Sequence, residues 1–258
     1  MSQITSVQQQ FGPNAERYAR ASYFGKQDSL DEAIRVANPQ PHWRMLDVAT
    51  GGGHCAFAFA LLVNHIIATD ITPQMLTAAS AVAQERGLSN IAFEPADAES
   101  LPFPDADFDL VMCRIAAHHF SDPGQAMREM ARVCKPGGRV GLIDPIVPSE
   151  RKLADEINAW ELLRDPSTVS VLTVTGWSSL FCAAGLDAVH INTCEIPLDF
   201  DDLLARSSCA AETNAHLRAG LLGGSDGMRE WLKPEMKSGR LVFVWPQVLI
   251  VGRIYRGV

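Results

Sequence analysis

The sequence predicts an α/β fold built on a doubly wound, mostly parallel β-sheet with helices on both faces. Between residues 45 and 144, short apolar segments with strand character alternate with helical segments, and the links between them are short. This alternation is typical of parallel sheets, because parallel neighbours need a crossover connection that is usually helical. Glycines and acids follow the predicted strands, at the edge where such sheets bind their ligands.

Composition limits the classes of protein to which the chain can belong. It has 258 residues, of which 47% are hydrophobic and 20% charged, and this suffices for one domain with a well-buried core. A formal net charge of −8 argues against nucleic acid and anionic membranes as partners. We find no apolar segment long enough to span a membrane and no apolar signal core near Met1, so we expect a cytoplasmic protein.

The cysteines and histidines do not predict a metal site. The six cysteines form no Cys-x-x-Cys pair and most lie in apolar segments, so we expect reduced, buried thiols. The seven histidines show no His-Glu-x-x-His or comparable ligand spacing. We therefore expect no resident metal ion.

The segment Met45–Asp70 reads as a strand, a glycine turn, an apolar helix and a second strand that ends on an acid. Gly51, Gly52 and Gly53 allow a tight turn in which bare backbone approaches a ligand. A helix that begins near Gly53 would point free N–H groups at that ligand. Asp70 lies at the same edge of the sheet and can accept hydrogen bonds from a ribose diol, so the segment predicts a nucleoside-containing cofactor.

The glycine turn leaves two cofactor classes open. Gly51, Gly53 and Ala56 fit the G-x-G-x-x-G/A fingerprint of dinucleotide-binding proteins, and Asp70 follows at about the expected 20-residue distance. A nicotinamide-dependent dehydrogenase would keep these residues. Asp47 inside the first strand, and the lack of a Tyr-x-x-x-Lys pair, argue against that class.

Polar residues also follow the other predicted strands. Asp97 comes just after the strand Ile91–Glu94, where its carboxylate can accept the exocyclic amino group of adenine, or can instead cap its own turn. The strand Phe108–Cys113 runs into Arg114 and two histidines, and a later strand ends at Asp144. Because the carboxyl ends of parallel strands share one edge, we expect these residues to line one site.

His118 and His119 are the candidate catalytic residues. They follow the fourth predicted strand, where a neutral imidazole can take a proton from a substrate. With the ordinary imidazole pKa of about 6.5, a catalytic His119 would make the rate rise through neutral pH. The alternative is a structural pair that caps the next helix or packs beside Phe120.

The C-terminal part of the chain predicts helices, an alternating strand and a final β-rich segment that Pro246 interrupts. Arg164 in this part, like Arg114, could bind an acidic substrate. A salt bridge to a nearby acid, Asp144 or Asp165, is an equal alternative.

The segment Phe11–Ala37 predicts two short helices before the sheet, with a break near Gly25. Its aromatic residues include Tyr18 and Tyr23. Such a segment can fold over a bound ligand as a lid, or it can simply pack against the sheet, and both interpretations remain open.

Several short motifs occur in a fixed order. They are Asp47-Val-Ala-Thr-Gly-Gly-Gly, Asp70, Ala96-Asp97-Ala98 followed by Leu101-Pro102-Phe103, Phe108-Asp109-Leu110-Val111 and Lys135-Pro136-Gly137-Gly138. In this order and spacing the span Met45–Ile143 resembles the core of class I S-adenosylmethionine-dependent methyltransferases, in particular the type 11 group with its ubiquinone/menaquinone C-methyltransferase-like proteins. No quinone-methylase signature follows in the C-terminal half.

The resemblance implies a Rossmann-like sheet of seven strands with an antiparallel last strand. It also implies S-adenosyl-L-methionine as cofactor, with S-adenosyl-L-homocysteine as product, and a small-molecule acceptor methylated on carbon, oxygen or nitrogen. We expect a single methyltransferase domain over residues 1–258, with a helical lid (1–40), a cofactor-binding core (41–148) and a substrate-side part (149–258), and leave a homodimer open. The residues expected to contact the cofactor are Tyr18, Asp47, Thr50, Gly51, Gly53, Asp70, Ile71, Met75, Asp97, Ala98 and Arg114.

Two other functions remain open at this stage. Methyl transfer has no invariant catalytic residue, so a non-catalytic or repurposed S-adenosylmethionine-binding module would carry the same motifs. An NAD-dependent dehydrogenase is the weaker alternative, for the reasons given above.

Overall fold

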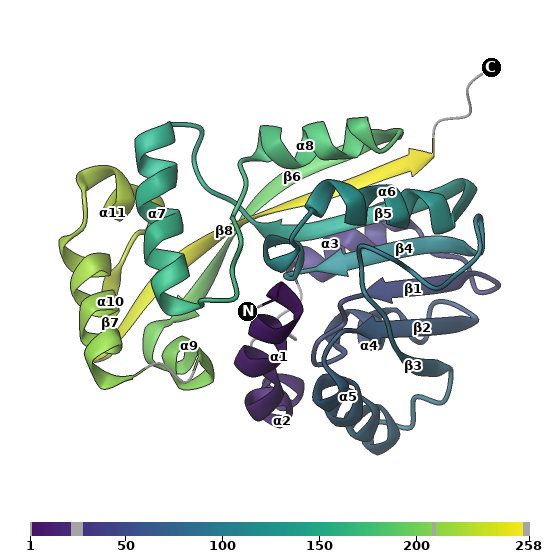
Figure 1. The fold of residues 1–258 in the computed structure, drawn as a ribbon, viewed down its shortest axis with the longest axis horizontal. Helices are drawn as coiled ribbons and strands as arrows, with labels where there is room; N and C mark the ends of the chain where they lie inside the picture. The colour runs from purple at the N-terminus through teal and green to yellow at the C-terminus, as the bar shows by residue number, and fades with distance from the viewer. Residues whose placement is uncertain (1, 22–27, 208–209, 255–258) are drawn as a thin grey trace.

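A twisted β-sheet runs through the molecule and carries helices on its two faces (Figure 1). Its strands lie in the order β3-β2-β1-β4-β5-β8-β6, and β7 pairs with β8. The computed structural model describes residues 2–21, 28–207 and 210–254. The strands are β1 (Arg44–Val48), β2 (His65–Asp70), β3 (Ile91–Pro95), β4 (Phe108–Arg114), β5 (Cys134–Pro145), β6 (Leu186–Asp199), β7 (Glu235–Lys237) and β8 (Arg240–Ile254).

Strands β1 to β5 pair in parallel, whereas β8 runs antiparallel to both of its neighbours, β5 and β6. The order of successive strands across the sheet reverses between β1 and β4: β2 and β3 lie on one side of β1, and β4 and β5 lie on the other. Open parallel sheets bind ligands at such a point. This confirms the predicted α/β fold with an antiparallel last strand. The short β7 is an addition to the seven expected strands, and it joins β8 through Ser238 and Gly239, both with positive φ, as tight hairpins require.

Local signals begin two of the helices. Pro73 is the first residue of α5, directly after Thr72, and the Asp122 side chain caps α6 by accepting from Gln125 N at 2.8 Å. Within the described residues, no helix combines the length and the apolar character needed to cross a membrane. The helices are α1 (Gln3–Phe11), η1 (Gly12–Asn14), α2 (Ala15–Arg20), α3 (Asp28–Ala37), α4 (His54–Phe59), α5 (Pro73–Glu85), η2 (Ala117–His119), α6 (Pro123–Val133), α7 (Arg151–Arg164), α8 (Val174–Ala183), α9 (Phe200–Ser207), α10 (Ala211–Gly223) and α11 (Asp226–Leu232).

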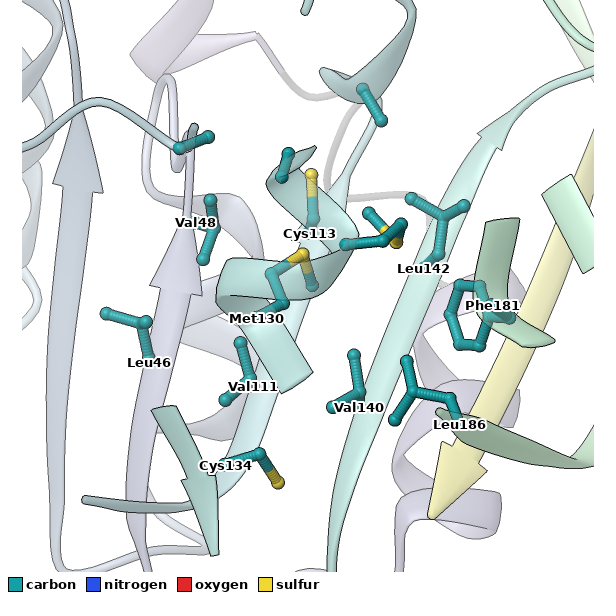
Figure 2. Packing of buried hydrophobic residues seen from close by; sticks show 14 of the residues in the cluster. Leu46, Val48, Val111, Cys113, Met130, Cys134, Val140, Leu142, Phe181 and Leu186 are labelled. Carbon is teal, nitrogen blue, oxygen red and sulfur yellow. The ribbon is translucent and has the colours of Figure 1, made fainter. Parts of the chain in front are cut away.

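Helices α6 and α8 cover one face of the sheet. Met130 of α6 and Phe181 of α8 are fully buried against alternate residues of the strands beneath them (Figure 2). The strand residues that Figure 2 labels on this face are Leu46, Val48, Val111, Cys113, Cys134, Val140, Leu142 and Leu186. Burial of each large apolar side chain stabilises the fold by about 1.5–3 kcal/mol, so this layer anchors the strands whose ends form the site.

Helices α3 and α4 cover the opposite face. Leu30 of α3 and Phe59 of α4 pack on the strand residues that alternate with the first set, among them Met45, Leu110 and Met112. Because both faces are covered, β1 and β4 read as nearly continuous apolar runs.

A third apolar cluster lies beside the parallel part of the sheet. The long strand β8, the yellow arrow in Figure 1, extends past β5, and helices α7, α9, α10 and α11 gather around its first half. Trp160 of α7 contacts Phe243 and Trp245 of β8, with ring centroids 5.9 and 6.2 Å apart. The end of β8 thus forms part of the core, while its beginning carries the helices of the C-terminal part.

The N-terminal helix α1 was not predicted from the sequence, because residues 3–10 are mostly polar, although Ile4, Val7 and Phe11 recur at helical spacing. Ser2 begins this helix by accepting a hydrogen bond from Thr5 N at 3.2 Å. Helices α2 and α3 correspond to the two expected short helices. The expected break at Gly25, and Tyr23, lie outside the described residues.

Two turn-forming sequences do not interrupt the described strands. Strand β5 already begins at Cys134, before the motif Lys135-Pro136-Gly137-Gly138, and this motif shows as a register shift against β4, with Gly137 at φ +81°. Strand β8 continues through Pro246, since a proline removes only one N–H donor and its carbonyl still accepts from Ile146 N. The division of the chain into lid, core and substrate-side part stays a prediction.

Gly52 should be essential for docking helix α2 on the glycine loop. A Cβ at Gly52 would lie 2.7 Å from Ala19 Cα and 2.9 Å from Tyr18 O, both backbone atoms that cannot rotate away. We expect Gly52→Ala to lower the free energy of unfolding by about 1–3 kcal/mol, as overpacking does, and to speed hydrogen exchange over residues 15–20. Gly223→Ala is the matched control, because a Cβ there meets no atom within 4 Å. Equal stability and exchange in the two variants would show that α2 does not depend on this contact.

Candidate active site

A cavity of about 380 Å³ lies at the carboxyl ends of β1, β2 and β4, and α1 forms another of its walls. Its volume is in the range of about 300–1,000 Å³ that is usual for small-molecule sites. Except for Gly53, every residue expected to act on or contact a ligand lines it: Tyr18, Asp47, Thr50, Gly51, Asp70, Ile71, Met75, Asp97, Ala98, Arg114, His118 and His119. The structure thus brings these residues together, while their contact with a cofactor stays a prediction.

The glycine loop after β1 has the shape that its sequence predicts. Gly51 has φ +53°, and a Cβ there would meet no atom within 4 Å, so its backbone faces open space in the cavity wall. Gly53 instead shapes the turn: its φ is +85°, and a Cβ would lie 2.4 Å from the Phe57 ring. Helix α4, which follows, has only 6 residues, and Asp47 already binds its Ala56 N–H. The expected set of free helix N–H groups is therefore only partly available.

Asp47 fixes the beginning of this loop from inside the sheet. Its Oδ2 accepts hydrogen bonds from Thr50 Oγ1 at 2.6 Å and from Ala56 N at 3.0 Å. Its Oδ1 is buried and accepts from no N–H or O–H group of the described residues. Burial raises the pKa of Asp47 to about 6, and these hydrogen bonds oppose the rise. One oxygen of this carboxylate thus has no N–H or O–H donor among the described residues, although Cys55 also hydrogen-bonds the carboxylate.

Asp70 links the loops that follow two neighbouring strands. Its Oδ2 accepts from Gly51 N at 2.9 Å, and its Oδ1 accepts from Thr72 N at 2.8 Å. Burial raises the pKa of Asp70, although these backbone donors favour its charged form. A carboxylate has about four lone-pair sites, so Asp70 can still accept two further hydrogen bonds from the cavity.

Asp97 follows β3 in the chain and caps its own turn. Its Oδ1 accepts from Glu99 N at 2.9 Å, so the structural role that the sequence left open is present. Asp97 also lines the cavity, with Ala98 beside it. The two roles are compatible, because the second carboxylate oxygen keeps its own lone pairs.

The N-terminal segment lies along the cavity rather than away from it. Gln3 Nε2 donates to His119 O at 2.8 Å and to Ser167 O at 2.5 Å, and Gln8 Nε2 donates to Ile71 O at 2.8 Å. The Phe11 ring contacts the rings of Tyr18 and His119, with centroids 5.4 and 5.1 Å apart. Polar side chains and the Phe11 ring therefore attach α1 to the walls of the site.

His118 forms a buried pair with Asp144, the last acid of β5. Its Nδ1 lies 2.7 Å from Asp144 Oδ1, while Asp144 Oδ2 accepts from Ala116 N and Ala117 N at 3.1 and 2.8 Å. Burial lowers the pKa of His118, but the charge and hydrogen bond of Asp144 outweigh it and hold that pKa above its ordinary value. The preceding Ile115 has φ +53°, which is unusual for a β-branched residue and marks a strained turn in the cavity wall.

His119 remains neutral beside this pair. Its ring centroid lies 4.0 Å from that of His118, and its Nδ1 lies 3.3 Å from Ser167 Oγ. Burial, followed by the positive charge of His118, lowers the pKa of His119 to about 3. The expectation that titration of His119 raises the rate through neutral pH is therefore wrong, because this imidazole is already neutral there.

Arg164 has partners among the acids of its own helix and turn. It forms a buried ion pair with Glu161, lies 3.6 Å from Asp165 Oδ2, and donates to Ser207 Oγ at 2.8 Å. Its guanidinium also lies over the Trp245 ring at 5.4 Å. The salt-bridge alternative for Arg164 is therefore present, in a wall of the same cavity.

The C-terminal half contributes more to the cavity than the sequence indicated. Its lining residues that sequence reasoning missed are Glu161, Asp165, Leu198, Leu203, Arg206, Trp245 and Gln247. Gln247 Oε1 is buried and has no hydrogen-bond partner in the described part of the chain. The one local signal was the Asp-Pro-Ser sequence at 165–167, in which Asp165 Oδ1 accepts from Ser167 N at 3.0 Å to form a turn.

Comparison with known proteins identifies the class. The family described as a methyltransferase domain matches residues 46–142. The uncharacterized methyltransferase YcgJ of Bacillus subtilis is 38% identical over 220 residues, 85% of this chain and 87% of that protein. The crystal structure of YcgJ has a TM-score of 0.83 at 36% identity and covers 89% of this chain and 99% of its own.

Two further relatives agree. A putative methyltransferase from Bacillus halodurans has a TM-score of 0.82 at 30% identity, covering 88% of this chain and 99% of its own. The demethylmenaquinone methyltransferase of Deinococcus radiodurans is 45% identical over 105 residues, which are 39% of this chain and 42% of that protein. The chain belongs to this methyltransferase family. It is an S-adenosylmethionine-dependent methyltransferase.

Acid should destabilise the fold through His119. An imidazole in the unfolded chain takes up a proton below pH about 6.5, whereas His119 in the fold does so only near pH 3, so stability falls as the pH drops between these values. From this group alone, the free energy of unfolding, measured by urea titration, should be about 2 kcal/mol lower at pH 5 than at pH 8.

His119→Gln should lack this part of the pH dependence. His118 acts in the opposite sense, because its raised pKa gives stability that is present below pH about 6.5 and lost as the pH rises through its folded value. The variant should therefore lose less stability in acid than the wild-type protein. An identical pH dependence in the two proteins would contradict a buried, neutral His119.

Proposed function

We propose that this protein transfers the methyl group of S-adenosyl-L-methionine to a small-molecule acceptor that must give up a proton. The observation that carries the proposal is one cavity that joins three strand-end carboxylates to a buried histidine pair. The carboxylates match hydrogen-bond donors of a nucleoside and an amino acid. The neutral member of the histidine pair supplies a proton acceptor.

The residues present fit this cofactor. Asp70 has lone pairs left for the two ribose hydroxyls, Asp97 for the adenine amino group, and the open Oδ1 of Asp47 for the ammonium group of the methionine part. Gly51 has no side chain, so its backbone is exposed to the cavity beside these carboxylates. When bound, S-adenosylmethionine supplies a methyl group on a sulfonium, and its carbon–sulfur bond breaks, with the electron pair staying on sulfur, as the acceptor forms its new bond to the methyl carbon.

The acceptor is proposed to bind on the side formed by the C-terminal half. Apolar residues there, Leu198, Leu203 and Trp245, surround the polar Gln247, and this combination suits an apolar molecule with a hydrogen-bond donor. The quinone precursor named for the Deinococcus relative is not carried over, because that match covers only 39% of this chain. The cytoplasmic location and the homodimer stay predictions.

His119 is proposed as the general base. Its side chain lines the cavity and contacts the Phe11 ring, and it needs no change of protonation state to act at neutral pH. His118 is proposed to hold the turn through Asp144 and to stay charged. The pKa of His118 is raised and that of His119 is lowered, so the first suits the charged, structural role and the second the role of neutral base.

Asp70→Ala should weaken binding of S-adenosylhomocysteine by about 1.5–3 kcal/mol, the usual scale for hydrogen bonds to a charged group. This equals roughly a ten- to hundredfold rise in Kd, measured by calorimetric titration. Because Asp70 also holds the backbone of the Gly51 loop, a 2′-deoxy ligand separates the two effects: it should lose most of its sensitivity to the substitution. Asp155→Ala, exposed on α7, is the control. Equal affinity of wild type and variant would leave Asp70 as a loop anchor only.

His119→Ala should lower kcat by roughly 10²–10⁴, the usual contribution of a general base, with little change in cofactor affinity. His119→Gln keeps a polar side chain of similar size that cannot take up the proton. The rate should stay low in this variant also. The wild-type rate should not rise through neutral pH on account of His119, because this imidazole is already neutral there. Recovery of the rate with glutamine would mean that the residue only positions the acceptor.

A further inference from the structure

We infer that Ser167 and Asp165 are positioning residues that keep the proton of neutral His119 on Nδ1, so that Nε2 presents a lone pair to the cavity. Neither residue belongs to the motifs of the cofactor-binding core. The inference about the ring itself is independent of the reaction. The use of the lone pair by an acceptor rests on the proposed function.

The turn after α7 places these two residues against the histidine loop. Asp165 N donates to Glu161 O at 2.8 Å, Thr168 N donates to Asp165 O at 3.0 Å, and Pro166 between them fixes φ. Both side chains are buried, with 1% of each residue exposed. The turn is also tied to the histidines directly, because Val169 N donates to His118 O at 2.9 Å. The side chains therefore cannot move away without breaking several buried hydrogen bonds.

The hydrogen atoms can be assigned by counting donors. Asp165 Oδ2 lies 3.6 Å from the Arg164 guanidinium and Asp165 Oδ1 accepts from Ser167 N at 3.0 Å, and both contacts favour the ionised carboxylate. Ionised Asp165 can only accept, so the Ser167 hydroxyl, 2.5 Å away, must donate its single hydrogen to it. Ser167 Oγ can then only accept from His119 Nδ1, 3.3 Å away.

This assignment leaves one orientation for the neutral imidazole. With hydrogen on Nδ1, the Nε2 atom of His119 carries a lone pair. Which ring nitrogen carries the proton is set by the hydrogen bond of the other nitrogen. The hydroxyl of Ser167 is the side-chain acceptor that favours hydrogen on Nδ1, beside a hydrogen bond from the ring to the Ser167 backbone.

The hydrogen-bonded chain Asp165–Ser167–His119, called the relay below, also stabilises the positive charge that His119 gains when it takes up a proton. An acceptor O–H, N–H or acidic C–H bond breaks as its proton forms a bond to Nε2, and the electron pair left on the acceptor forms the bond to the methyl carbon. His119 then carries a positive charge at a site where burial and His118 oppose it. Asp165, through the hydroxyl of Ser167, supplies the nearby negative charge, so no further proton needs to move.

The side-chain nitrogen spectrum of histidine tests this inference without substrate or cofactor. In ¹⁵N-labelled protein at pH 7.5, the resonances of His119, assigned by comparison with His119→Gln, should show protonated Nδ1 and bare Nε2. Ser167→Ala should move the spectrum towards the other tautomer or an average of the two. Ser170→Ala, three residues further along the segment, is the control and should leave the spectrum unchanged. A wild-type spectrum with protonated Nε2, or no change in Ser167→Ala, would overturn the inference.

Kinetics separates this inference from the proposed function. A general base contributes roughly 10²–10⁴, so Ser167→Ala should lower kcat at least about tenfold, with an unchanged Kd for S-adenosylhomocysteine. If the tautomer is as stated but His119→Ala retains full activity, the relay exists and the proposed base is wrong. If His119 is required but the tautomer is reversed, the proposed base survives and the relay fails.

Discussion

Buried carboxylates at the ends of the parallel strands are the constraint on which the site depends. Asp47, Asp70 and Asp144 end or precede strand ends, and each is at most 7% exposed. A buried carboxylate costs several kcal/mol unless hydrogen bonds satisfy it, and these acids find their donors in the backbone of the surrounding loops. Asp70 holds the loop after β1 through Gly51 N, and Asp144 holds the loop after β4 through Ala117 N. Each loop is therefore fixed by the neighbouring strand, and the cavity keeps its shape because no loop can move alone.

Much of this arrangement follows from sequence periodicity. Apolar strands of predictable length place Asp47, Asp70 and Asp97 at one edge of the sheet, and the glycines after the first strand indicate a ligand-binding turn at that edge. The helix α1 was missed because its segment is mostly polar and its glutamine contacts depend on carbonyls that only the folded chain presents, although Ile4, Val7 and Phe11 have helical spacing. Ser167 was equally hidden: it lies 48 positions from His119, and no local pattern encodes a contact over that distance. The pKa of His119 follows from burial and from His118, which sequence spacing alone does not quantify.

The two halves of the cavity carry different kinds of information. The half built by β1 to β4 contains the motifs of the family model, whose match covers residues 46–142. The other half is formed by α7, α9 and β8, and it holds the buried Arg164 pair, Gln247 and the turn with Ser167. A fold fixes neither chemistry nor substrate by itself, so acceptor choice must be sought in the second half. His119 lies where the two halves meet, with Gln3 of α1 bound to its carbonyl.

The central claim is that the strand-end acids build a site for S-adenosylmethionine rather than for a dinucleotide. Calorimetric titration of the purified protein with S-adenosylhomocysteine and, separately, with NAD measures this most directly. The account predicts saturable binding of S-adenosylhomocysteine, competed by S-adenosylmethionine, and no heat with NAD at the same concentrations. Tight binding of NAD together with no response to S-adenosylhomocysteine would contradict it.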